Sequence, residues 1–121
     1  LLEGDWIADV VGLSGATARC VFVQPAGGGP RIELLEYRNP AGAPLDGASR
    51  PHAVGLRHIA LEVDDLDAVA VRLADAGVPR ISDPVAVPFQ LVGGIRKRLF
   101  YSLDPDGVIV EFCAHERVEP D

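Results

Sequence analysis

The second half of the chain has the clearest alternation of apolar and polar residues. Residues 56–63, LRHIALEV, alternate between the two kinds, and this pattern predicts a β-strand. The next segment, residues 66–76, has apolar residues at helical spacing and is predicted to be a helix. Asp64 and Asp65 are suitable N-cap residues for this helix, and Gly77 is a suitable C-cap.

Three further strands are predicted after this helix, over residues 78–87, 96–103 and 108–113. Prolines interrupt the first of them, so we expect an edge strand or an irregular one. The sequence DPDG at residues 104–107 has Pro and Gly where a type I turn prefers them, and it separates the last two strands. The expected order is therefore strand, helix, strand, strand, strand.

The first half of the chain is predicted to contain a short helix and a β-hairpin. Residues 5–13 have an N-cap candidate in Asp5, apolar residues at helical spacing and a stop signal in Gly12. Residues 16–24 and 31–37 are predicted strands. A Gly-rich turn joins them, which indicates an antiparallel pair.

A loop rich in Pro, Gly and Ala, residues 39–51, is the best candidate for a boundary between two modules, residues 1–51 and 52–121. The two modules share a pattern in which a strand and a turn are followed by a second strand. This second strand contains a Glu among aliphatic residues, which is Glu33 in the first module and Glu111 in the second. The first module has no counterpart of the opening strand and helix of the second. Supplying them would take about 40 residues. We therefore expect a truncated or partly disordered form of a longer protein, with a natural short form as the alternative.

Three residues of the predicted strands are candidates for chemistry: Glu33, His58 and Glu111. His58 is expected on the strand face opposite to the aliphatic face that packs on the helix. Both glutamates have aliphatic neighbours, and a carboxylate in such surroundings is costly to bury without a cation or a hydrogen-bond donor. Taken singly, a His or Glu in a strand is more often exposed or structurally satisfied. His52 and His115 are expected at the surface.

The sequence resembles a known superfamily in three segments. RHIALEVDDLDAV at residues 57–69 and YSLDPDGVIVEF at residues 101–112 resemble the two ends of a module in the vicinal oxygen chelate superfamily of glyoxalases, bleomycin-resistance proteins and extradiol dioxygenases. RIELLEY at residues 31–37 is similar to the closing strand of that superfamily's first module. The resemblance implies an α+β fold. In it, paired βαβββ modules form a cupped mixed sheet, with the first module N-terminally incomplete in this chain.

The resemblance also implies a metal centre. His58 is similar to the first-strand ligand of the second module, Glu111 to its last-strand ligand, and Glu33 to the last-strand ligand of the first module. A fourth ligand, usually His or Gln, would lie in the strand that the first half lacks. Imidazole and carboxylate ligands suit a divalent ion such as Ni, Co, Zn, Mn or Fe.

The implied activity is that of a lyase or isomerase. The metal would chelate two neighbouring oxygens of a small substrate and stabilise an enediolate during proton transfer, with Glu111 or Glu33 as the catalytic base. Two Glu and one His resemble the glyoxalase ligand set more than the dioxygenase set of two His and one carboxylate from one module. The alternatives are a ring-cleaving dioxygenase, an acyl-thioester epimerase, a metal-free drug-binding protein of the bleomycin-resistance type, and a degenerate structural half-module.

Composition narrows the expected partners. The net charge is −7 and the one basic cluster is residues 96–98, which disfavours nucleic acid as a partner. No apolar run approaches the roughly 20 residues of a membrane-spanning helix. Cys20 and Cys113 are expected to be core thiols of a cytoplasmic protein. A small-molecule substrate is the expected ligand, and exposed sheet edges favour a homodimer.

The segment of residues 85–98 resembles the superfamily's flexible loop beside the cavity. Two interpretations are open for Arg96 and Arg98 in this segment. Either they bind the anionic tail of a substrate, or they are solvated surface charges. Trp6 and Phe89 are candidates either for a pocket wall or for the core.

Overall fold

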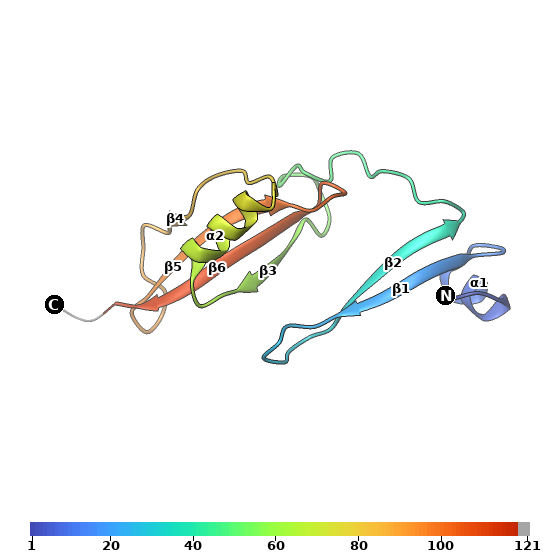
Figure 1. Cartoon of the computed structure of the whole chain (residues 1–121), viewed down its shortest axis with the longest axis horizontal. Coiled ribbons are helices and arrows are strands. Elements are labelled where there is room, and N and C mark those ends of the chain that lie inside the picture. The colour runs from blue at the N-terminus through green and yellow to red at the C-terminus, as the bar shows by residue number, and fades with distance from the viewer. Residues whose placement is uncertain (119–121) are drawn as a thin grey trace. The chain divides into compact units, whose positions relative to one another are not determined.

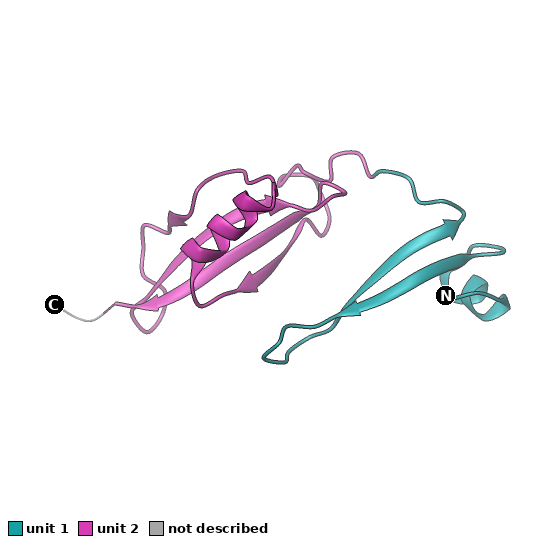
Figure 2. Cartoon of the chain, in the orientation of Figure 1, with its two compact units in different colours: residues 1–44 teal, residues 45–121 magenta. Residues whose placement is uncertain are grey.

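The computed structural model describes residues 1–118 and divides the chain into two compact units. The first unit is Leu1–Pro44, and the second begins at Leu45 (Figure 2). This division falls inside the loop of residues 39–51, in which the module boundary is expected.

The first unit consists of helix α1, Asp5–Val11, and the hairpin of β1, Thr17–Val23, and β2, Ile32–Asn39 (Figure 1). The two strands are antiparallel, as predicted. Gly12 ends the helix in the left-handed conformation with φ 70°, which favours glycine.

The predicted N-cap of α1 is wrong by one residue. Gly4 is the N-cap, and Asp5 is the first residue of the helix and makes no capping hydrogen bond with its side chain. Gly4 has φ 97° and ψ 177°, a backbone conformation that favours glycine. The carboxylate of Asp5 still lies in the first turn, where the helix dipole favours negative charge.

The second unit contains the βαβββ order that the sequence predicts. Its elements are β3, His58–Glu62; α2, Leu66–Asp75; β4, Val85–Ala86; β5, Ile95–Leu103; and β6, Ile109–Arg117. The sheet order is β3-β6-β5-β4, with β3 parallel to β6 and β5 antiparallel to both of its neighbours. β4 is a short edge strand, as its neighbouring prolines predict. β6 continues beyond the predicted end at residue 113 because β5 pairs with it as far as Arg117.

Helix α2 is fixed at both ends by its caps. The side chain of Asp65 accepts a hydrogen bond from the backbone N–H of Ala68 over 2.9 Å, as an N-cap does. At the other end, Gly77 has φ 71° and its N–H donates to the carbonyl of Ala74, while the N–H of Val78 donates to that of Leu73. These two bonds form a Schellman motif in which Ala76 is the C-cap, so the predicted C-cap, Gly77, is off by one residue and instead supplies the left-handed conformation that follows the cap.

The core of the second unit lies between α2 and one face of the sheet. Leu66 and Ala70 of the helix pack with Phe100 of β5 and Ala114 of β6. The ring of Phe112 stacks on that of Phe100 with centroids 5.6 Å apart. Side chains alternate along a strand, so the residues between these positions, on the same strands, belong to the opposite face. Among residues 1–118, no helix has the length and apolar composition needed to cross a membrane.

Candidate functional site

Glu111 is a buried carboxylate at the centre of the second sheet. It lies on β6, between β3 and β5, and is 3% exposed. Its direct neighbours across the ladders are Ala60 of β3 and Tyr101 of β5. Because these pairs share the face opposite to the Phe100–Phe112 stack, Glu111 belongs to the side of the sheet that α2 does not cover.

Both oxygens of Glu111 have charged or ionisable partners. His58 Nε2 lies 3.3 Å from Glu111 Oε2, and Lys97 Nζ donates to Glu111 Oε1 over 2.8 Å. The hydrogen bond with Glu111 raises the pKa of Lys97 above its ordinary value, with burial as the opposing effect. The His58 ring also lies beside the ring of Tyr101, with centroids 5.1 Å apart. Each oxygen of this buried carboxylate therefore has a polar partner, which offsets the cost of burying its charge.

The strand registers explain why these groups meet. His58 is paired with Ile109, two residues before Glu111 and on the same face of β6. Lys97 lies on the same face of β5 as Tyr101, which is directly opposite Glu111. Lys97 is four positions from Tyr101 along β5, so its contact with Glu111 runs along the strands and depends on the length of both side chains.

A second polar pair lies further along the same face. His115 Nδ1 and Glu62 Oε1 are 2.8 Å apart. His115 is exposed, as predicted, but it lies inside β6, opposite Lys97, and not beyond the end of the strand. Within residues 1–118, no three His, Cys, Asp or Glu side chains are grouped so that they could hold one ion. The second unit therefore supplies His58 and Glu111 as a pair of donors.

The third predicted ligand, Glu33, lies on β2 in the first unit. It accepts a hydrogen bond from Cys20 Sγ over 3.3 Å. In contrast to the burial expected from its aliphatic neighbours, Glu33 is exposed. The physical reason is that a two-stranded hairpin leaves its faces open unless another layer covers them.

The basic cluster of residues 96–98 is divided between the two faces of β5. Arg98 donates to both carboxylate oxygens of Asp67 on α2, each over 2.9 Å, and is thereby held on the helix side. Lys97 points to Glu111 on the other side. Arg96 and Arg98, for which the sequence indicates either anion binding or surface charge, do not include the residue that reaches the site, which is Lys97. The alternation along β5 was the available signal, because it places Lys97 on the face opposite to its two neighbours.

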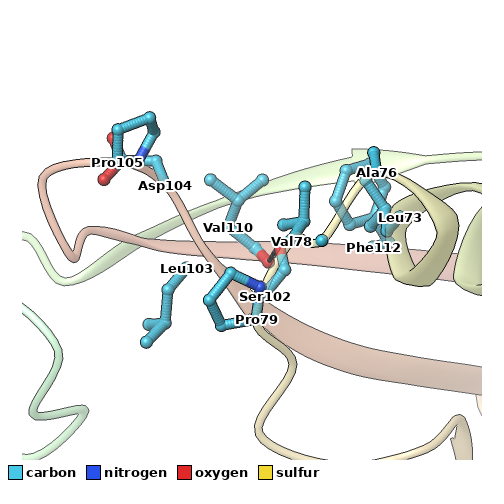
Figure 3. A pocket seen from close by; sticks show the side chains of 11 residues that line it. Leu73, Ala76, Val78, Pro79, Ser102, Leu103, Asp104, Pro105, Val110 and Phe112 are labelled. Carbon is cyan, nitrogen blue, oxygen red and sulfur yellow. Dashed lines mark hydrogen bonds between the residues drawn. The ribbon is translucent and has the colours of Figure 1, made fainter.

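An apolar pocket lies apart from these polar groups. It has a volume of ≈ 560 Å³ and lies between the end of α2 and the β5–β6 turn (Figure 3). Ser102, Val110 and Phe112 line it, and they belong to the helix-covered face of the sheet. Trp6 and Phe89, which are pocket-wall or core candidates, are 55% and 64% exposed.

The second unit is thus a βαβββ module with a buried carboxylate and an imidazole on its open face. These features are those expected of the vicinal oxygen chelate proteins that the sequence resembles. Residues 6–112 match the family described as the Glyoxalase/Bleomycin resistance protein/Dioxygenase superfamily. The chain belongs to this superfamily.

Relatives of known structure support the fold. A glyoxalase family protein from Bacillus cereus is 23% identical with a TM-score of 0.75, covering 94% of this chain and 72% of that one. A glyoxalase/bleomycin resistance protein/dioxygenase from Alicyclobacillus acidocaldarius is 18% identical with a TM-score of 0.50, covering 92% and 82%. The predicted α+β fold is confirmed by this likeness.

A curated relative is the uncharacterized protein YaeR of Escherichia coli. It is 37% identical over 81 residues, which are 66% of this chain and 54% of YaeR. The match thus spans about half the length of the curated relative.

Proposed function

We propose that this protein is a glyoxalase-like metalloenzyme, a lyase or isomerase, that holds a divalent ion with His58, Glu111 and Glu33. The observation behind the proposal is the 3.3 Å distance between His58 Nε2 and Glu111 Oε2 on the open face of the sheet. Two donors that bind one ion at about 2.0–2.2 Å each lie about 3 Å apart, so the pair is spaced as two ligands of one metal.

The donor chemistry fits such an ion. A neutral imidazole and a carboxylate suit Ni, Co, Zn, Mn or Fe(II), and they leave positions open for a ligand. The burial of Glu111 also means that its carboxylate needs a positive partner. Lys97 meets that need at Oε1, and Oε2 is directed to His58.

Glu111 and Glu33 are the proposed bases of the reaction. When bound, the ion would act as a Lewis acid toward two neighbouring oxygens of a small substrate, which acidifies the adjacent C–H. Glu111 or Glu33 would accept the proton and return it to the neighbouring carbon. Tyr101, beside the imidazole, would help to keep His58 in place. Burial of Glu111, which is 3% exposed, restricts the access of water to its carboxylate.

The glyoxalase type is favoured over the dioxygenase type by the ligands of the second unit. A dioxygenase site needs two imidazoles and one carboxylate. The second histidine on this face, His115, is paired with Glu62 and not with Glu111. The second unit therefore offers one imidazole to the site at Glu111.

A metal-free binding protein is the second candidate, and one contact favours it. Lys97 compensates the charge of Glu111 at 2.8 Å without any ion. The open face of the sheet, neutralised in this way, would hold a small molecule by hydrogen bonds without an ion.

We further propose that the protein works as a homodimer in the cytoplasm. The hairpin exposes several large apolar residues, among them Phe22 at 56% and Leu34 at 52%. A two-stranded hairpin is marginally stable alone, so burial of these residues against another surface would stabilise it. Cys20 and Cys113 are free thiols, as a reducing compartment requires.

Metal analysis of the purified protein tests the proposed function. We expect one equivalent of transition metal per chain by elemental analysis, and a loss of affinity of at least about tenfold in H58A, E111A and E33A. His52 is an exposed histidine in a loop, so H52A is the matched control and should bind as the parent protein does. A metal-free protein that binds aromatic cations would favour the second candidate. Unchanged affinity in H58A and E111A would exclude this ion site.

A further inference from the structure

Lys97 places a positive charge beside the proposed metal ligands. Its Nζ donates to Glu111 Oε1 over 2.8 Å, and its side chain is 25% exposed. The acid further along this face, Glu62, is already paired with His115 at 2.8 Å. Glu111 is thus the partner of Lys97 on this face of the sheet, and an ion bound by Glu111 would lie close to the ammonium group.

The balance of charge changes when an ion binds. A neutral His58, the Glu111 carboxylate and the Lys97 ammonium sum to zero. A divalent ion raises the sum to +2, and Glu33 as a further ligand would lower it to +1. Uncompensated charge is costly beside a carboxylate that is largely removed from water, as the 5% exposed side chain of Glu111 is. A ligand with one negative charge lowers the sum to +1, or to zero when Glu33 also binds the ion, whereas a neutral ligand leaves the sum unchanged.

We infer that Lys97 is a specificity-determining residue that binds an anionic oxygen of the substrate. In the free protein Lys97 neutralises Glu111. Once an ion occupies Glu111, the ammonium group pairs with the ligand. The substrate class is then small carboxylic acids with a second oxygen on the adjacent carbon. This inference rests on the proposed function, because without an ion Lys97 stays on Glu111.

The other cations of β5 are not placed for this role. Arg98 is held by Asp67 on the helix side, at 2.9 Å from both carboxylate oxygens. Arg96 shares the face of Arg98 because the two are separated by one residue, and it is paired in register with Glu116. Arg96 is therefore a matched control for the removal of one positive charge from the same strand.

The test uses the Co²⁺-loaded protein and two small probes. Glycolate has a carboxylate beside a hydroxyl, and glycolamide has the same framework of heavy atoms without the charge. Binding is followed by the visible spectrum of Co²⁺ and by titration calorimetry. We expect K97M to weaken glycolate binding about tenfold, the value of one charge-assisted hydrogen bond, and to leave glycolamide within about threefold. K97R should retain most of the glycolate affinity, and R96M should retain all of it.

Each other outcome has a definite meaning. Equal losses for both probes in K97M, no loss for either, or the same loss in R96M would overturn the role of Lys97 while the metal site stands. A parent protein that takes up no Co²⁺ would overturn the proposed function, and this inference with it. Circular dichroism checks that K97M folds. If it does not, K97Q repeats the comparison with a neutral side chain that can still donate a hydrogen bond to Glu111.

Discussion

Glu111 and Lys97 are unequal partners in burial, and this inequality predicts which loss is worse. The Glu111 side chain is 5% exposed and that of Lys97 is 25% exposed. If the carboxylate is removed, the lysine stem can carry its ammonium group to water. If the lysine is removed, the carboxylate remains buried with the imidazole of His58 as its nearest ionisable partner.

We therefore expect K97M to lower the free energy of unfolding more than E111Q does. The expected losses are about 3 kcal/mol for K97M, from a buried charge left uncompensated, and about 1 kcal/mol for E111Q. Urea denaturation of the metal-free proteins at pH 7 measures both. A larger loss in E111Q than in K97M would contradict this ranking, because the unpaired ammonium group would then cost more than the unpaired carboxylate.

Glu111 and His58 could be predicted as site residues from the sequence, whereas Lys97 could not, for a physical reason. The strand period fixes the face of each residue, so a His and a Glu on neighbouring strands could be placed from pattern and resemblance. The contact of Lys97 depends on a long side chain that reaches four positions along β5 from Tyr101, the residue opposite Glu111. Strand alternation gives the face of such a residue and not its partner.

Helix α2 is attached to the sheet partly by one exposed ion pair. Arg98 of β5 holds Asp67, and this hydrogen bond lowers the pKa of Asp67 below its ordinary value. A depressed carboxyl pKa stabilises the fold above the unfolded-state value of about 3.9, and this stabilisation is lost as the pH falls through the folded-state value.

We expect D67N to reduce stability at pH 7 and to have a diminishing effect as the pH falls toward 3. Unfolding curves at several pH values measure the difference between the two proteins. D64N is the control, because Asp64 is a nearby exposed carboxylate that makes no ion pair among residues 1–118. A difference that stays constant from pH 7 to pH 3 would contradict the assignment of the effect to ionised Asp67.

The N-cap of the same helix gives an independent prediction. Asp65 accepts a hydrogen bond from the N–H of Ala68, so D65A should cost about 1 kcal/mol of unfolding free energy. D65N, which keeps an accepting oxygen, should recover most of this loss. Equal losses for D65A and D65N would assign the effect to the charge of Asp65 rather than to the capping bond.

The chain contains two units that differ in how well the sequence predicts them. The fold of the second unit was largely predictable, whereas the exposure of residues in the smaller first unit was not. In the second unit, periodicity, caps and turns all agree with the observed order of elements. In the first unit the hairpin was predicted, but the exposure of Glu33 was not. Burial of Glu33 depends on the layer that covers the hairpin, and the residues of the hairpin themselves do not specify that layer.

The exposed hairpin predicts association through its apolar residues. Leu34 is 52% exposed on β2, and L34E should shift a dimer to a monomer because it would bury a charge at the interface. Size-exclusion chromatography with light scattering measures the mass. V71E changes an exposed apolar residue of α2 and is the control. A parent protein that is monomeric at high concentration would contradict the proposed homodimer.

The ligand pair itself is tested most directly by diffraction from crystals of the Co²⁺- or Zn²⁺-loaded protein, with the anomalous signal of the metal used to locate it. We expect a single ion within about 2.0–2.3 Å of His58 Nε2 and of a carboxylate oxygen of Glu111. An ion bound elsewhere, or no anomalous peak at His58 and Glu111 in fully loaded protein, would contradict the proposed metal centre.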